Sequence, residues 1–214
     1  MASKKAVRLS IVFISVILSL LIVVYLNQNI LPAVPILPRM VLLIAAQWII
    51  LIVPAIMMKQ DGTTLSALGF SKQNVWAQVL VGLMIALAMS LVLTVVPILF
   101  GLKSMVGSTQ YVQPWQFAYK ILGVALVEEI VFRGYVFQLL LDIKKSTGLA
   151  IIVSSLLFGF IHIIGGNIIQ VVMTALIGAL FCFCRLRIRN CSLLSLIIAH
   201  GVYDGLITLW VGLL

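Results

Sequence analysis

The sequence predicts an all-α protein, a polytopic transmembrane helical bundle of about seven spans. Of its 214 residues, 64% are hydrophobic and only 9% are charged, a balance far from that of soluble domains. Apolar stretches of about 20 residues recur along the chain, and each can cross a hydrocarbon core about 30 Å thick. We therefore expect one integral-membrane domain over residues 1–214.

Each apolar stretch is predicted to be one membrane-spanning helix. The expected ranges are 9–26, 40–58, 76–100, 117–141, 149–164, 168–184 and 192–213. The first stretch follows basic residues, as a signal peptide would. Its apolar run of about 18 residues is too long for the h-region of a signal peptide, and no small-residue cleavage site follows. We expect it to be retained as a helix.

The basic residues predict how the chain is oriented. With the N-terminus inside, the Lys and Arg residues in the loops and near the ends of the spans gather on the inner face, as the positive-inside rule favours. The inner set is Lys4, Lys5, Arg8, Lys59, Lys72, Lys144, Lys145, Arg185, Arg187 and Arg189, and the outer set is Arg39, Lys103 and Lys120. The net charge of +9 is therefore assigned to topology in a lipid bilayer, and no nucleic-acid partner is expected.

Ionisable residues inside the spans predict a functional site. Both histidines and three of the five acidic residues lie there, namely Glu128, Glu129, His162, His200 and Asp204. A charged side chain at the centre of a bilayer costs about 2.5–3.5 kcal/mol even on insertion scales. At about 1.5 Å per residue, these groups lie about 15–24 Å above the inner ends of their helices. Residues from three helices thus share one slab of the membrane and can meet in one intramembrane site.

The spacing within each helix predicts which side chains share a face. Glu129 and Arg133 are four residues apart, so they can form an ion pair in a low dielectric. Glu128 points about 100° away from Glu129 and is left free to face a cavity. His200 and Asp204 are also four residues apart, so their side chains lie on one face of the helix and can point to the same position. The Glu129–Arg133 pair could instead serve only to fix two helices, and Asp204 could only orient His200.

Small residues near these positions are interpreted as packing residues. Glycines that permit close helix approach are expected at Gly159, Gly165, Gly166, Gly201 and Gly205. The three cysteines, Cys182, Cys184 and Cys191, gather at the inner end of one span, where thiols stay reduced. Without a nearby histidine they make a poor zinc site.

A glutamate that acts as a general base, together with two histidines, can activate water and stabilise an oxyanion. These are the two requirements of peptide hydrolysis. No H-E-x-x-H helix, Gly-flanked serine turn or Gly-x-Gly-Asp motif is present, so other intramembrane protease designs do not fit. Two further classes stay open. One is a non-catalytic immunity or scaffold protein that binds a peptide or partner. The other is a small-solute or proton transporter, although the chain lacks the repeat symmetry of transporters.

Three motifs in this order resemble the CAAX protease and bacteriocin-processing (CPBP, Abi) family. They are Glu128-Glu129-x-x-x-Arg133, Phe158-x-x-x-His162 and His200-x-x-x-Asp204. Members are intramembrane endopeptidases related to the type II CAAX prenyl endopeptidases. The resemblance covers about residues 120–210. It implies that residues 117–214 form the catalytic helices, and that residues 1–116 serve as a scaffold or admit the substrate.

The resemblance also implies residue roles. Glu128 would be the general base, His162 would hold the attacking water, and Glu129 with Arg133 would keep the motif helix in place. His200 and Asp204 would stabilise the oxyanion. Many members carry Asn at the position of Asp204. Because an ionised aspartate would repel an oxyanion, Asp204 must be protonated, orient His200 or bind a metal.

The cofactor and the partners follow from the same resemblance. Glu128, His162, His200 and Asp204 are competent zinc ligands, and the family is described both as metal-dependent and as glutamate-dependent. Of the two, we favour a glutamate mechanism without metal over a zinc mechanism. The expected partner is a membrane-associated peptide or protein substrate. Links of family members to bacteriocin immunity and peptide processing point to a multi-pass protein of a bacterial cytoplasmic membrane.

Overall fold

The computed structural model describes residues 2–102 and 115–214, which form helices and no strand. The predicted all-α class is confirmed. In chain order the elements are α1 (Ala2–Tyr25), η1 (Leu26–Ile30), η2 (Leu31–Ala33), α2 (Ile36–Gln60), α3 (Leu65–Leu68), α4 (Val75–Ser90), η3 (Leu91–Val95), α5 (Val96–Leu99), α7 (Trp115–Ala118), η4 (Tyr119–Ala125), α8 (Leu126–Glu129), η5 (Ile130–Val136), α9 (Phe137–Lys144), α10 (Thr147–Ile161), η6 (His162–Ile164), α11 (Ile168–Arg187) and α12 (Leu193–Leu213).

Within the described residues, six helices are long and apolar enough to cross a membrane. They are Ser3–Ala33, Ile36–Gln60, Val75–Leu99, Thr147–Ile164, Ile168–Arg187 and Leu193–Leu213, and each coincides with a predicted span. The remaining predicted span, 117–141, lies in the continuous helical stretch 115–144, formed by α7 to α9. This stretch carries the Glu-Glu pair, so it is less apolar than the others. The count of seven spans and the inner N-terminus stay predictions.

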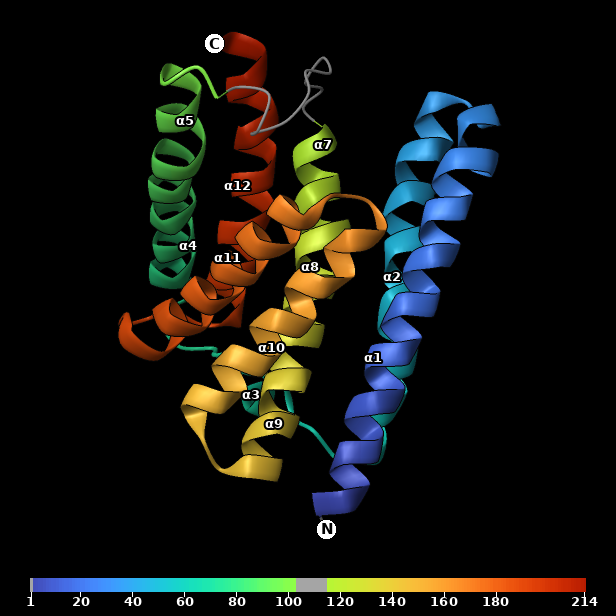
Figure 1. Ribbon diagram of the computed structural model, residues 1–214, viewed down its shortest axis with the longest axis vertical. Helices are drawn as coiled ribbons and strands as arrows, with labels where there is room; N and C mark the ends of the chain where they lie inside the picture. The colour runs from blue at the N-terminus through green and yellow to red at the C-terminus, as the bar shows by residue number, and fades with distance from the viewer. Residues whose placement is uncertain (1, 103–114) are drawn as a thin grey trace.

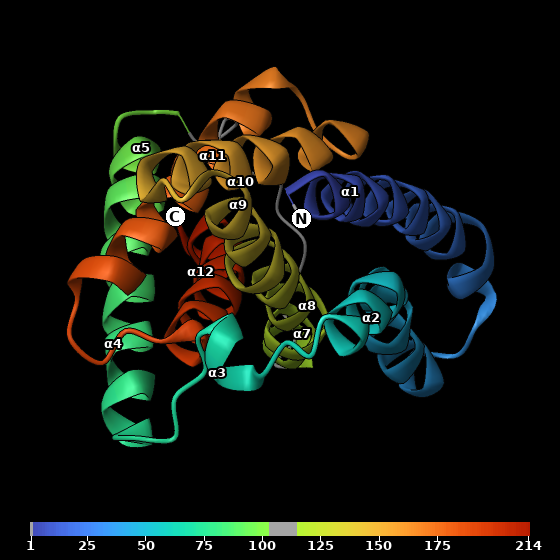
Figure 2. The same ribbon diagram turned by 90° about the horizontal axis from the view of Figure 1, so that it is seen from below.

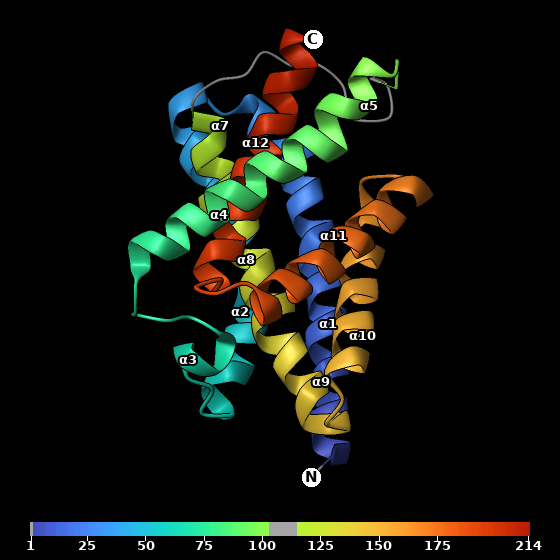
Figure 3. The same ribbon diagram turned by 90° about the vertical axis from the view of Figure 1, so that its left-hand side faces the viewer.

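The stretch 115–144 occupies the middle of the bundle. Helices α1 and α2 pack against each other on one side of it, and α4 packs against α12 on the other side (Figures 1 and 2). Helices α10 and α11 form a further hairpin beside it, and α4 crosses α12 at a slant (Figure 3). The two chain ends lie at opposite ends of the bundle (Figure 1). The central stretch is therefore surrounded by helices and can carry buried polar groups.

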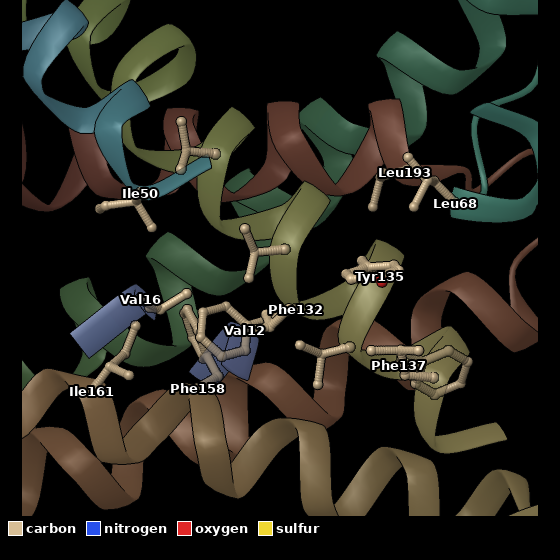
Figure 4. Packing of buried hydrophobic residues seen from close by; sticks show 14 of the residues in the cluster. Val12, Val16, Ile50, Leu68, Phe132, Tyr135, Phe137, Phe158, Ile161 and Leu193 are labelled. Carbon is tan, nitrogen blue, oxygen red and sulfur yellow. The ribbon is translucent and has the colours of Figure 1, made fainter. Parts of the chain in front are cut away.

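One apolar core joins the N-terminal helices to the central stretch. Val12 and Val16 of α1 are at most 1% exposed and belong to the same buried cluster as Phe132 of η5 and Phe158 of α10 (Figure 4). Ile50 of α2 joins them at 2% exposed. Because lipid tails are as apolar as these side chains, the cluster stabilises the bundle through van der Waals packing between helices. The first apolar stretch is thus packed into the bundle core.

Two glycines hold α12 close to α7 and η4. A Cβ added at Gly201 would lie 2.6 Å from the Cα atom of Ile121, and one at Gly205 would lie 2.4 Å from the ring of Phe117. Neither position has room for a methyl group. Close helix approach, predicted for both glycines, is confirmed.

The other predicted glycine contacts have mixed outcomes. A Cβ at Gly159 would lie 2.5 Å from the carbonyl oxygen of Val171, so α10 and α11 meet there as predicted. The prediction is wrong for Gly165, where no atom lies within 4 Å. Gly166 is crowded by the nearby side chain of Gln170. The sequence near the α10–α11 turn shows glycines but not which of them face a helix.

Candidate functional site

The candidate site is assembled from three parts of the fold. Glu128 and Glu129 form the end of α8, a single α-helical turn between the π-helical segments η4 and η5. His200 and Asp204 lie on α12, and His162 caps the C-terminal end of α10. π-helical turns inside α-helices are frequent at functional sites. The predicted slab of polar residues is therefore built around an irregular central helix.

Glu129 is the fully buried centre of this cluster. Its Oε1 atom lies 3.1 Å from Nη1 of Arg133 and 2.9 Å from Nδ1 of His200. The side chains of Glu129 and Arg133 are 0% and 1% exposed, so the predicted ion pair is confirmed. The hydrogen bond to His200 was not predicted. Because an ionised carboxylate only accepts hydrogen bonds, Nδ1 of His200 carries a proton and the ring is held with Nε2 on its opposite edge.

Arg133 is held by aromatic rings as well as by charge. Its Cζ atom lies 3.9 Å from the ring centre of Phe158 and 5.5 Å from that of Phe181. A Cβ at Gly178 would lie 2.9 Å from Nη2, so this glycine makes room for the guanidinium. Stacking on desolvated rings adds about 2 kcal/mol to such a contact. Gly178 was missed in the sequence because it has no polar pattern around it.

Glu128 approaches the same imidazole from the other edge. Its Oε2 atom lies 3.8 Å from Nε2 of His200. This oxygen is buried and has no hydrogen-bond partner among the described residues. The carboxylate is free, as its rotation of about 100° from Glu129 predicted, but it faces His200. An unpaired buried carboxylate oxygen is costly, and such atoms call for an explanation.

Asp204 lies between His200 and a cation that the sequence prediction had assigned to the outer face. Its Oδ2 atom is 3.9 Å from Nε2 of His200 and 3.4 Å from Nζ of Lys120. Lys120 belongs to η4, and its side chain is 32% exposed. From the sequence, Lys120 was used only to predict the orientation of the chain in the membrane, so this contact was not predicted. One signal was available, because Lys120 is the only lysine inside any predicted span.

His162 lies beside the cluster. Its Nδ1 atom is 2.9 Å from the carbonyl oxygen of Phe158, and its ring packs edge-on to Phe158 with centroids 4.8 Å apart. The predicted shared face of these two residues is confirmed. Since a carbonyl only accepts, Nδ1 carries the proton of this hydrogen bond and Nε2 is left on the opposite edge of the ring. Phe158 also lies 6.1 Å from the ring of His200. Across the described residues, no ion pair joins His162 to an acid.

Arg185 is a second cation that the sequence prediction placed only on the inner face. Its Nη1 atom donates a hydrogen bond of 2.5 Å to the carbonyl oxygen of Arg133. Arg133 lies in η5, where i→i+5 bonding disturbs the regular pairing of backbone groups. Arg185 therefore ties the end of α11 to the backbone that carries the buried ion pair. Nothing in the spacing of the sequence predicts a contact 52 residues apart.

In the part of the chain that the structure describes, no group of three His, Cys, Asp or Glu residues that could hold a metal ion is found. Nδ1 of each histidine is engaged in a hydrogen bond, so a metal could bind only at Nε2, as is common for metal-ligating histidines. Oε2 of Glu128 and Oδ2 of Asp204 lie 3.8 Å and 3.9 Å from Nε2 of His200. The three cysteines are unpaired and buried, in line with the predicted packing role.

The C-terminal half of the chain matches a known family. Residues 110–206 match the model of the family described as type II CAAX prenyl endopeptidase Rce1-like. No curated protein and no solved structure matches the chain. The matched segment contains every residue of the cluster, namely Lys120, Glu128, Glu129, Arg133, His162, His200 and Asp204.

Proposed function

Because residues 110–206 match the model of the Rce1-like family of type II CAAX prenyl endopeptidases, we propose that the chain is an intramembrane endopeptidase. Its substrate would be a membrane-associated peptide or protein in which one peptide bond is hydrolysed. The observation that carries this proposal is the unpaired, buried Oε2 atom of Glu128 beside Nε2 of His200. A candidate base and a potential donor to an oxyanion thus lie next to each other.

Glu128 acts as the general base. Its Oε2 atom has no competing hydrogen-bond donor among the described residues, so it can accept a proton from a bound water. The resulting hydroxide forms a bond to the carbonyl carbon of the substrate, and the π electron pair moves to the carbonyl oxygen. The tetrahedral intermediate then breaks its C–N bond. Glu128 returns the proton to the leaving amine nitrogen, which balances the reaction.

His200 stabilises the oxyanion. Glu129 holds Nδ1 of His200 at 2.9 Å, so Nε2 is the atom presented to the substrate. Protonated at both nitrogens, the ring donates from Nε2 to the developing negative charge, and such preorganised donors contribute about 2.7–4 kcal/mol in other hydrolases.

His162 helps to hold the attacking water. Its Nδ1 atom is fixed on the carbonyl of Phe158, so the free Nε2 atom accepts a hydrogen bond from water. We propose that the reaction needs no metal, because the carboxylate of Glu128 can itself activate the water. Residues 117–214 would carry the chemistry, and residues 1–116 would scaffold it or admit the substrate. We further propose a bacterial cytoplasmic membrane with the N-terminus inside.

The test compares peptides from cells that carry the wild-type chain or Glu128→Gln at matched expression. Membrane and secreted peptides of a deletion strain are profiled by mass spectrometry. We expect a precursor that stays intact only in the variant. Asp142→Asn is the matched control, because it makes the same carboxylate-to-amide change on a half-buried side chain at the inner end of α9.

The same experiment separates the alternative class. A non-catalytic immunity or scaffold protein would give identical peptide profiles for the wild type and Glu128→Gln, and the variant would still restore the deletion phenotype. That result would overturn the proposed protease.

A further inference from the structure

Lys120 is the one cation of the cluster that the proposed reaction leaves without a role. Its Nζ atom lies 3.4 Å from Oδ2 of Asp204, and the same oxygen lies 3.9 Å from Nε2 of His200. The three side chains therefore form a row from η4 to the imidazole. Their exposed fractions fall along it, from 32% for Lys120 to 22% for Asp204 and 9% for His200. Lys120 stands at the open end and His200 at the closed end.

The fold fixes this row from both sides of Asp204. Gly201 brings the backbone of α12 against Ile121, and Gly205 brings it against Phe117. These contacts bracket Lys120 in the sequence of η4 and α7, one residue after it and three residues before it. Because neither glycine leaves room for a methyl group, α12 and η4 cannot separate without losing packing. The contact between Lys120 and Asp204 is thus built into the helix pairing.

Asp204 presents an electrostatic difficulty for the proposed reaction. A carboxylate 3.9 Å from Nε2 of His200 lies close to where an oxyanion would form. Two like charges at such a separation repel each other strongly in a medium of low dielectric. An opposite charge on the far side of Asp204 reduces that repulsion. Lys120 is the cation in that place.

We propose that Lys120 is a positioning residue that neutralises Asp204 and thereby allows the oxyanion to form beside it. Lys120 acts through Asp204 and does not itself touch the reacting atoms. With Lys120 in place, Asp204 orients Nε2 of His200 without adding net negative charge to the oxyanion position. This inference rests on the proposed endopeptidase function.

The test is a double-variant cycle on the purified full-length chain in lipid nanodiscs. The probe is the precursor peptide identified by the comparison of the wild type with Glu128→Gln. Lys120→Met should lower kcat by about 10- to 100-fold, the range typical of residues that orient a site residue, with little change in KM. Lys120→Arg, which keeps the charge, should retain most of the activity.

The decisive variant is Lys120→Met/Asp204→Asn. Asparagine carries no charge to be compensated, so the double variant should recover the activity of Asp204→Asn alone. Lys59→Met is the control for the loss of a positive charge, since Lys59 is exposed in the last turn of α2. A merely structural Lys120 would give no recovery when Asp204 is also changed.

The outcomes separate the two proposals. If Glu128→Gln leaves the precursor intact, as the endopeptidase function requires, and the double variant stays as slow as Lys120→Met, only the role of Lys120 is overturned. Equal kcat for Lys120→Met and the wild type would overturn it too. If the wild type and Glu128→Gln give the same peptide profile, the endopeptidase function fails, and the role of Lys120 fails with it.

Discussion

Removing Arg133 should destabilise the bundle more than any other single charge change. The side chain is 1% exposed and lies 3.1 Å from Glu129, which is 0% exposed. Arg133→Met would leave the Glu129 carboxylate buried without its guanidinium partner. Breaking a buried pair in this way costs about 3–5 kcal/mol. The lost stacking on Phe158 and Phe181 costs about 2 kcal/mol at most, so the uncompensated charge dominates.

The assay is the free energy of unfolding in mixed micelles, measured by titration with a denaturing detergent. Arg133→Met/Glu129→Gln should be more stable than Arg133→Met, because the amide still accepts the hydrogen bond from His200 and no charge is left unpaired. Arg187→Met is the matched control, an exposed arginine whose Cζ atom lies 5.9 Å from the ring centre of Phe183. A loss of less than about 1 kcal/mol for Arg133→Met, the size of an exposed pair, would refute the reasoning.

Three further predictions concern packing, thiols and metal. Gly201→Ala should lower the thermal unfolding midpoint, because its Cβ would lie 2.6 Å from the Cα atom of Ile121. Gly212→Ala on the same helix is the control and should leave the midpoint unchanged, because its Cβ meets nothing within 4 Å. Equal midpoints for the two variants would contradict the close packing. Burial raises the pKa of the Cys191 thiol to about 12. Because only the thiolate reacts, its alkylation rate should be very low at pH 8 and should rise about tenfold per pH unit below that pKa. Stoichiometric labelling within minutes at pH 8 would show that the thiol is not buried. Cleavage of the precursor should survive thorough chelation with no stoichiometric metal in the purified chain, and loss of activity that zinc restores would overturn the metal-free mechanism.

Local patterns in the sequence predicted the parts of the site that lie on one helix. The four-residue spacing of Glu129 and Arg133 predicted their ion pair, and the same spacing predicted the shared face of Phe158 and His162. Both follow from helix periodicity alone. The apolar stretches likewise predicted where the helices lie, because the length of a span is set by the bilayer.

Contacts between helices were not predictable in the same way. The hydrogen bond between Glu129 and His200 joins residues 71 positions apart, and the pair of Lys120 and Asp204 joins residues 84 positions apart. The helical rise per residue predicted that these helices carry polar groups at the same membrane depth. It did not predict which faces of the helices point toward each other. Facing depends on helix rotation, which the π-helical segments η4 and η5 change. Lys120 was assigned to the outer face from the topology alone, so its contact with Asp204 was not predicted.

The most direct test of the central claim follows oxygen in a single turnover. The purified chain, in excess over the precursor, cleaves it in water enriched in oxygen-18, and both products are analysed by mass spectrometry. Activation of water by Glu128 predicts the label in the new carboxyl terminus and none in the tryptic peptide 121–133, which contains Glu128. Label in the side chain of Glu128 would mean that it attacks the substrate itself, and would contradict its role as general base.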